Sequence, residues 1–205
     1  MTEFWEEAFR QNGEMWGWQP ARSAVLANEL FLAGGVKSLL VPGIGYGRNA
    51  RVFRDSGIAV TGIEVSGTAI DMAKRYFGDE LKIYHGSVTG MPFDDKLYDA
   101  VFCYALIHLL DKAGRRKLIR DCYGQLAESG LMVFTAVTKQ AAIYREGTYV
   151  SKDRFEVFNG VKMFFYDVQT IAEEFGKAGL FGITEITEGY PFYLIECKKE
   201  KAAGP

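Results

Sequence analysis

A glycine-rich turn that directly follows an apolar run is the feature that most restricts how this chain can fold. The run Ser38–Val41 ends at the segment VPGIGYGR, residues 41–48, and a helix is expected to begin after this segment. Glycines at such a place let the backbone turn sharply and approach a ligand near the helix N-terminus. The segment therefore predicts a strand, a ligand-binding loop and a helix in succession. A tight turn that binds nothing is the alternative interpretation.

Short apolar runs recur along the chain, and helical patterns lie between them. Strands buried on both faces of a parallel sheet have this composition. Helices are expected after the N-cap residues Ser66, Asp111 and Asp167, and the second of these helices should end at Ser129-Gly130. The alternation predicts an α/β fold, a doubly wound sheet with helices on both faces. The runs occupy residues 38–41, 58–63, 81–84, 100–103 and 131–134.

Two segments depart from this alternation. Residues 183–187 and 192–197 are joined by a short link, which favours an antiparallel pair at the end of the sheet. Asn159-Gly160 lies between two β-prone runs, so a hairpin inserted near residues 154–166 is expected. We expect a single domain over residues 1–205, with an N-terminal cover segment at 1–35, a core at 36–198 and a flexible tail at 199–205.

Composition restricts the partners. The chain of 205 residues has a formal net charge of -2, which gives no reason to expect nucleic acid or an anionic membrane as a partner. The longest apolar stretch, residues 100–107, is far too short to span a bilayer. The three cysteines form no CxxC pair and the two histidines have no metal-ligand spacing, so no metal site is expected. These features favour a cytoplasmic protein, as a monomer or a homodimer.

Glu64 closes the second apolar run and is the first candidate for a specific ligand contact. A carboxylate at a strand end can accept hydrogen bonds from the hydroxyl groups of a ribose. Enzymes that use NAD have an acid at a similar distance from their glycine loop, so Glu64 alone does not distinguish the two cofactors. The plainer interpretation is a solvated acid at the end of a strand.

Three segments taken together resemble the successive motifs of the class I S-adenosylmethionine-dependent methyltransferases. They are residues 41–47, residues 62–66 (GIEVS) and residues 98–102 (YDAVF), within a similarity that covers roughly residues 36–137. The resemblance implies a seven-stranded Rossmann-like sheet whose last strand is antiparallel, and S-adenosyl-L-methionine as the cofactor. It implies transfer of a methyl group as the reaction.

Pro42 departs from that family, which usually has an acid immediately before the first glycine. A proline there resembles the small-molecule branch that contains thiopurine, thiol and tellurite-resistance methyltransferases. The resemblance to this branch implies a small-molecule acceptor, and a soft nucleophile such as a thiol is the expected one.

The resemblance also implies roles for individual residues near the cofactor. Gly43, Gly45 and Gly47 would pass close to its methionine and ribose parts. Glu64 would hold the ribose hydroxyls, and Val65 would pack on the adenine.

Four further residues carry expected cofactor contacts. Ser87 and Val88 sit where the family often has an acid and a backbone amide that face adenine. Tyr104 follows the fourth run, beside the methionine part and the acceptor. Trp18 belongs to a tryptophan-rich N-terminal segment that related enzymes place over the cofactor, where aromatic faces favour a sulfonium cation. Packing of an N-terminal helix on the sheet is the alternative.

The acceptor side offers fewer signals. His108 and Tyr104 are the candidate catalytic residues, with His108 as a possible base. A lone histidine in an apolar run is more often structural. Tyr46, Phe164 and Tyr166 are candidate substrate-binding residues, and core packing is the alternative for the last two.

Two functions of another class remain open from the sequence alone, and a protein or RNA methyltransferase remains open within the same enzyme class. The first is a non-catalytic module that binds S-adenosylmethionine, because a fold does not establish catalysis. The second is an NAD(P)-binding oxidoreductase. The glycine spacing disfavours it, because a dinucleotide fingerprint needs GxGxxG and Arg48 follows Gly47 directly.

Overall fold

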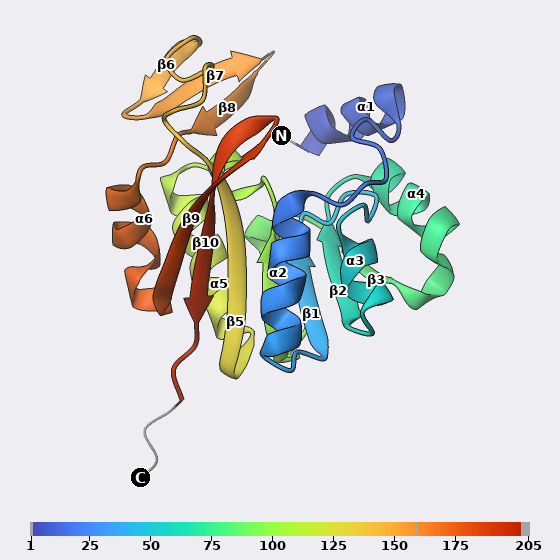
Figure 1. Cartoon of the computed structure of the whole chain (residues 1–205). Coiled ribbons are helices and arrows are strands. Elements are labelled where there is room, and N and C mark those ends of the chain that lie inside the picture. The colour runs from blue at the N-terminus through green and yellow to red at the C-terminus, as the bar shows by residue number, and fades with distance from the viewer. Residues whose placement is uncertain (1, 159, 202–205) are drawn as a thin grey trace.

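The computed structural model describes residues 2–158 and 160–201, and a seven-stranded sheet forms its main body (Figure 1). The strand order is β3-β2-β1-β4-β5-β10-β9. Neighbouring strands from β3 to β5 are parallel, and β10 runs antiparallel to both β5 and β9. The predicted sheet with an antiparallel last strand is confirmed. The strands are β1 (Ser38–Pro42), β2 (Ala59–Glu64), β3 (Lys82–His85), β4 (Tyr98–Cys103), β5 (Leu126–Val137), β9 (Leu180–Glu188) and β10 (Tyr190–Lys198).

Helices cover both faces of this sheet because side chains along each buried strand alternate between the faces. In β1, Leu39 and Val41 pack in one core with helices α2 and α3, whereas Leu40 packs in the other with α5 and α6. Figure 1 shows α2 in front of β1. The helices are α1 (Thr2–Asn12), α2 (Arg22–Ala33), α3 (Ala50–Asp55), α4 (Gly67–Phe77), α5 (Lys112–Gly124) and α6 (Val168–Phe175).

The three predicted N-caps begin their helices. The Ser66 side chain accepts a hydrogen bond from the Ala69 amide at the start of α4. Asp111 and Asp167 do the same at the starts of α5 and α6, each at 2.8 Å from an amide nitrogen. These caps satisfy amides that a helix cannot pair within itself.

The predicted end of α5 was wrong. The helix stops at Gly124, and β5 already begins at Leu126, so Ser129-Gly130 lies inside the strand. Ser129 has a φ of 62°, and the register with β4 shifts between Tyr98 and Ala100. The pair Ser129-Gly130 therefore marks an irregularity inside β5. A glycine in a strand often indicates such an irregularity, as it often indicates a helix end.

The inserted hairpin is present, but it belongs to a separate three-stranded sheet of order β6-β7-β8. The hairpin strands are β7 (Arg154–Phe158) and β8 (Val161–Phe164), and β6 (Thr148–Ser151) was not predicted. Gly160 has the positive φ that the turn requires, whereas Asn159 and residues 202–205 of the predicted tail lie outside the described residues. Figure 1 shows this small sheet and α1 beyond the same end of the main sheet.

Candidate active site

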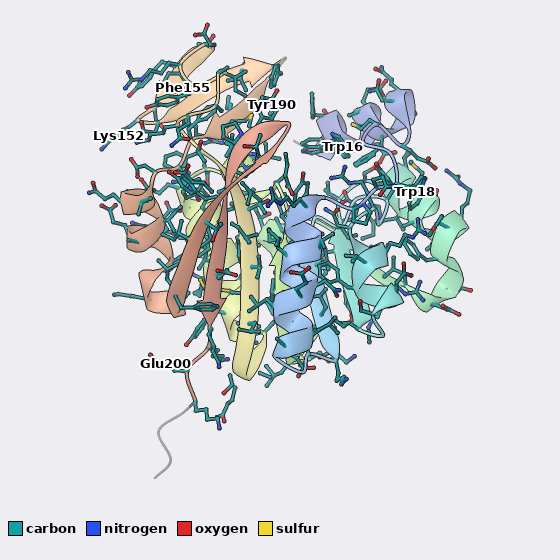
Figure 2. The ribbon with its side chains drawn as sticks, viewed as in Figure 1. Trp16, Trp18, Lys152, Phe155, Tyr190 and Glu200 are labelled. Atoms are coloured by element: carbon teal, nitrogen blue, oxygen red, sulfur yellow. The ribbon has the colours of Figure 1, made fainter. Side chains whose placement is uncertain are left out.

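A cavity of about 870 Å³ lies at the carboxyl ends of β1, β2 and β4. Ligands of open α/β sheets bind at this edge, where the loops after parallel strands meet. The rest of the wall comes from α1 and the residues that follow it in the chain, from the strands β7 and β8, and from the β9–β10 turn. Figure 2 shows Trp16 and Tyr190, two of the lining residues, on the side of the molecule that carries α1 and the small sheet.

The glycine loop forms the floor of this cavity. Gly43 and Gly45 have φ values of 71° and 59°, a conformation that residues with a Cβ rarely adopt. A Cβ on Gly43 would lie 3.0 Å from the side chain of Leu106, another lining residue, so a glycine avoids a close contact here. Gly47 also has a positive φ but lies outside the cavity, because the Phe77 ring packs against it. The structure thus brings two of the three predicted glycines to the site.

Glu64 lies buried behind this loop and accepts three backbone hydrogen bonds. The amide of Gly45 donates to Oε2 at 2.8 Å, and the amides of Val65 and Ser66 donate to Oε1 at 2.8 and 2.9 Å. Burial raises the pKa of this carboxyl, although the three amide hydrogen bonds oppose the shift. Glu64 therefore fastens the glycine loop to the end of β2 while it lines the cavity.

The loop that follows β3 contains the residues that the sequence predicts to contact adenine. Ser87 and Val88 both line the cavity there, together with Val65. The Ser87 hydroxyl accepts a hydrogen bond from the Thr89 amide at 3.3 Å, and Val88 is buried. These predicted residues come together with Glu64 and the glycine loop on one side of the cavity.

An aromatic N-terminal segment covers the cavity. Trp5, Phe9 and Trp16 line it, and the Trp16 ring stacks on Tyr46 with 6.3 Å between ring centroids. The Tyr46 hydroxyl donates to the Gly17 carbonyl at 2.7 Å and accepts from the Trp16 amide at 3.2 Å. Tyr46 therefore lines the cavity as predicted, but its polar atom holds the covering segment.

Trp18 does not reach the cavity. Its ring stacks on Tyr76 of α4, with 4.1 Å between the ring centroids, and packs edge-on against Tyr46 at 5.3 Å. Figure 2 shows Trp18 apart from Trp16. Of these two residues, Trp16 is the one that lines the cavity. Gly17, at a φ of 64° between them, turns the backbone so that the two rings take different directions.

A second anchor holds α1 to the start of α4. The Glu6 carboxylate accepts hydrogen bonds from the Ser66 hydroxyl at 2.7 Å and the Thr68 hydroxyl at 2.5 Å. These hydrogen bonds, led by the one from Thr68, lower the pKa of Glu6. Because the Ser66 amide also donates to Glu64, the cover and the glycine loop share one hydrogen-bonded network.

Tyr104 and His108 line the other side of the cavity, after β4. Burial raises the pKa of the Tyr104 phenol, and the charge of Glu188 adds to the shift. His108 is only 3% exposed, and its Nδ1 has no hydrogen-bond partner among the described residues. Burial lowers the pKa of His108 to about 3, so the imidazole is neutral.

Phe164 and Tyr166 lie in the core and not in the cavity. Side chains alternate along β8, so Met163 lines the cavity and Phe164 points the opposite way. There the Arg115 guanidinium lies 3.7 Å from the centroid of the Phe164 ring. The Tyr166 hydroxyl donates to Glu174 at 2.9 Å, and Arg115 forms a buried ion pair with the same carboxylate.

Sequence reasoning missed Arg48 and Glu188, which both line the cavity, whereas Phe158 and Met163, which also line it, belong to the hairpin expected from the sequence. Arg48 follows the glycine motif directly, and that position was a usable signal. Glu188 is the last residue of β9, beside the β9–β10 turn. Its place in the cavity wall depends on the order of the strands in the sheet. Among residues 2–158 and 160–201, no group of three potential ligands could hold a metal ion.

The buried histidine makes stability depend on pH. The unfolded chain binds a proton at His108 below a pH of about 6.5, whereas the folded chain does not until about pH 3. Folding therefore becomes less favourable by up to about 1.4 kcal/mol for each pH unit within this window. Urea unfolding of wild type and His108→Gln at pH 7, 6 and 5 should show the variant losing less stability with acid. His85→Gln, at an exposed histidine, is the control; equal acid losses in wild type and His108→Gln would contradict the prediction.

The fold and this cavity define a Rossmann-like domain that binds a cofactor at the carboxyl edge of its sheet. Residues 40–134 match the family model described as a methyltransferase domain. This match and the shared fold support a class I S-adenosylmethionine-dependent methyltransferase with S-adenosylmethionine as its cofactor. No curated protein sequence gives a significant match to the chain. Among the described residues, no helix is both long and apolar enough to cross a membrane.

Several solved structures share the fold at low sequence identity. The 1,6-didemethyltoxoflavin-N1-methyltransferase of Burkholderia thailandensis is 12% identical, with a TM-score of 0.76 over 98% of this chain and 87% of that one. A structure concerning the conversion of a disulfide bond into a thioacetal group during echinomycin biosynthesis is 16% identical, with a TM-score of 0.75 over 98% and 92%. The magnesium protoporphyrin IX methyltransferase of Synechocystis PCC 6803 is 12% identical, with a TM-score of 0.66 over 87% and 79%.

The residues present fit this cofactor. Gly43 and Gly45 bring backbone without side chains to the cavity wall, and the Glu64 carboxylate lies beside Gly45. The aromatic faces of Trp5, Phe9 and Trp16 suit a sulfonium cation. Both features lie in one cavity, so a single ligand can contact them together.

Proposed function

We propose that the protein methylates a small molecule whose attacking atom carries no proton to remove, such as a thiolate or a ring nitrogen. The observation that carries this proposal is that neither candidate base beside the cavity accepts a proton readily near neutral pH. His108 has a pKa of about 3, and burial raises the pKa of Tyr104, which keeps it a neutral phenol. A hydroxyl acceptor usually needs a base or a metal, whereas a soft nucleophile does not.

The walls around the acceptor support a small and largely apolar molecule. Leu109, Phe158, Met163 and Phe192 line this side of the cavity, and His108 contributes an unpaired nitrogen. An apolar pocket with a few polar groups is typical of small-molecule sites. The neutral His108 imidazole is available to orient an acceptor by one hydrogen bond.

Bound S-adenosylmethionine supplies a methyl group that is already activated by the positive charge on its sulfur. The task left to the chain is to align the acceptor with that methyl group and to exclude water. We assign the alignment to Tyr104 and His108. The exclusion of water falls to the covering segment with Trp16 and to the strands β7 and β8, which contribute Phe158 and Met163 to the cavity wall.

We assign the cofactor contacts to the cavity residues that the sequence motifs indicate. Gly43 and Gly45 contact its methionine and ribose parts, and Glu64 contacts the ribose hydroxyls. Val65, Ser87 and Val88 surround the adenine, and Tyr46 holds the cover from below. Each of these residues lines the cavity, which supports the assignment.

Two of the similar structures come from enzymes whose named reactions are compatible with this proposal. The Burkholderia enzyme is named for methylation at a nitrogen and was solved with 1,6-didemethyltoxoflavin and S-adenosylhomocysteine bound. The echinomycin structure concerns the conversion of a disulfide bond into a thioacetal group. Both involve small molecules with nitrogen or sulfur at the reacting position, and this likeness favours a nitrogen or sulfur acceptor for the present chain.

The remaining expectations concern partners and location. We propose that the protein works in the cytoplasm, as a monomer or a homodimer, as a single domain without a nucleic-acid partner. The formal net charge of -2 supports the last point, because phosphate backbones attract basic surfaces.

A metal-free methylation assay over thiols, N-heterocycles and phenols tests this function. We expect thiols or heterocycles to be methylated, and we expect His108→Gln to lower kcat by less than about tenfold, because removal of a general base costs about 10²–10⁴-fold. Tyr104→Phe is the matched variant on the same loop. Activity confined to phenols and abolished by His108→Gln would make His108 the base and refute the proposal. Cofactor binding without turnover of any acceptor would instead favour a non-catalytic binding module.

A further inference from the structure

Arg48, Tyr104 and Glu188 form a polar group at one side of the cavity. They come from the loop after β1, the loop after β4 and the end of β9, and all three line the cavity. The Arg48 guanidinium lies 5.5 Å from the centroid of the Tyr104 ring. Burial raises the pKa of the Tyr104 phenol, the charge of Glu188 adds to the shift, and the charge of Arg48 opposes it. A positive and a negative group thus both act on one phenol in the cavity wall.

Glu188 is the carboxylate in this cavity that keeps the larger free capacity to bind a ligand. Among the residues that the structure describes, Glu64 and Glu188 are the two carboxylates in the cavity wall. Glu64 is occupied by three backbone amides. Glu188 accepts hydrogen bonds from the Ser23 amide and, at 3.0 Å, from its hydroxyl. A carboxylate accepts about four hydrogen bonds, so Glu188 keeps free acceptor sites.

Arg48 is the positive counterpart. It is the one cationic side chain in the wall of the cavity, counted over the described part of the chain. One of its nitrogens donates to the Trp16 carbonyl at 3.1 Å, and its other donors stay available. The cofactor ends in an amino acid, which carries an ammonium and a carboxylate close together. The sequence places the uncharged Pro42 before the first glycine, so the loop itself offers no acid for that ammonium.

We propose that Glu188 binds the ammonium group of the cofactor's amino-acid end and that Arg48 binds its carboxylate, with Tyr104 beside them. The β9–β10 turn thereby supplies the acid that the glycine loop lacks. This inference rests on S-adenosylmethionine being the cofactor. It adds two residues, Glu188 and Arg48, that recognise the amino-acid end of the cofactor. Glu188 also joins the turn to the start of α2 through Ser23, which fixes its position.

Two ligands that differ only at the amino-acid end test the inference. S-adenosylhomocysteine has this end, and 5′-methylthioadenosine lacks it. We expect Glu188→Gln and Arg48→Met each to weaken binding of S-adenosylhomocysteine by about 10–100-fold in calorimetry, as the loss of a charged hydrogen bond does. Binding of 5′-methylthioadenosine should change by less than about threefold. Glu185→Gln, an exposed acid on the same strand, is the matched control and should leave both affinities as in wild type.

The second ligand also reports on folding, because a misfolded variant loses both. Equal weakening of the two ligands in Glu188→Gln and in Arg48→Met would overturn the proposal, and so would unchanged binding of both. If wild type itself binds neither ligand, the cofactor assignment fails, and that result is distinct from a failure of the two residues.

Discussion

Glu64→Ala should weaken binding of S-adenosylhomocysteine by about one to two powers of ten, since a hydrogen bond to a charged group contributes about 1.5–3 kcal/mol. The carboxylate does two things at once. It lines the cavity where ribose hydroxyls are expected, and it accepts the amides of Gly45, Val65 and Ser66. Its removal leaves three buried amides without their acceptor, so the glycine loop should also lose order.

Glu64→Gln separates the two roles. The glutamine keeps one carbonyl acceptor and the shape of the side chain but puts an NH2 group where amides now donate. We expect its affinity to fall between wild type and Glu64→Ala, with circular dichroism spectra close to wild type. A folded Glu64→Ala protein with unchanged affinity would contradict this account and reduce Glu64 to a residue that shapes the loop.

Arg115→Ala should destabilise the protein by about 3–5 kcal/mol, because it leaves a buried carboxylate without its partner. The Arg115–Glu174 ion pair has an N–O distance of 2.8 Å, and its side chains are 4% and 7% exposed. The same carboxylate accepts the Tyr166 hydroxyl, and the guanidinium lies against Phe164. Urea unfolding monitored by fluorescence measures the loss directly.

The double variant Arg115→Met with Glu174→Gln is the control for this prediction. It removes both charges, keeps the volume and leaves an amide oxygen to accept from the Tyr166 hydroxyl, and removing both charges of a buried pair is often nearly neutral. We therefore expect it to recover most of the stability lost in Arg115→Ala. A double variant as unstable as the single one would show that the ion pair itself, and not the stranded charge, carries the stability. Cofactor affinity should stay close to wild type in the double variant, since neither residue lines the cavity.

Features that depend on neighbouring residues were predictable from the sequence. The N-caps Ser66, Asp111 and Asp167 each act on an amide three residues ahead, so local chemistry decides them. The glycine loop and Glu64 follow parallel strands, and parallel strands bring their carboxyl ends to one edge. The strand β6 was not predictable in this way, because all four of its residues are exposed and leave no alternating apolar pattern.

The site was harder to predict where it depends on the phase of a strand or on distant segments. Phe164 was the residue of β8 named for the pocket, yet one position along the strand exchanges the two faces, and Met163 lines the cavity instead. Trp16 and Trp18 differ only by a turn at Gly17, and the turn sends them to different places. Glu188 reaches the cavity because β9 and β10 pair at the far end of the sheet, which no local pattern indicates.

Isothermal titration calorimetry with S-adenosylmethionine, S-adenosylhomocysteine and NADH tests the central claim most directly. The account predicts saturable binding of the first two ligands at one site per chain and no comparable binding of NADH. Gly43→Val should abolish that binding, because a branched side chain at a φ of 71° would strain the loop and press on Leu106 in the cavity wall. Saturable binding of NADH without binding of S-adenosylmethionine would contradict the account.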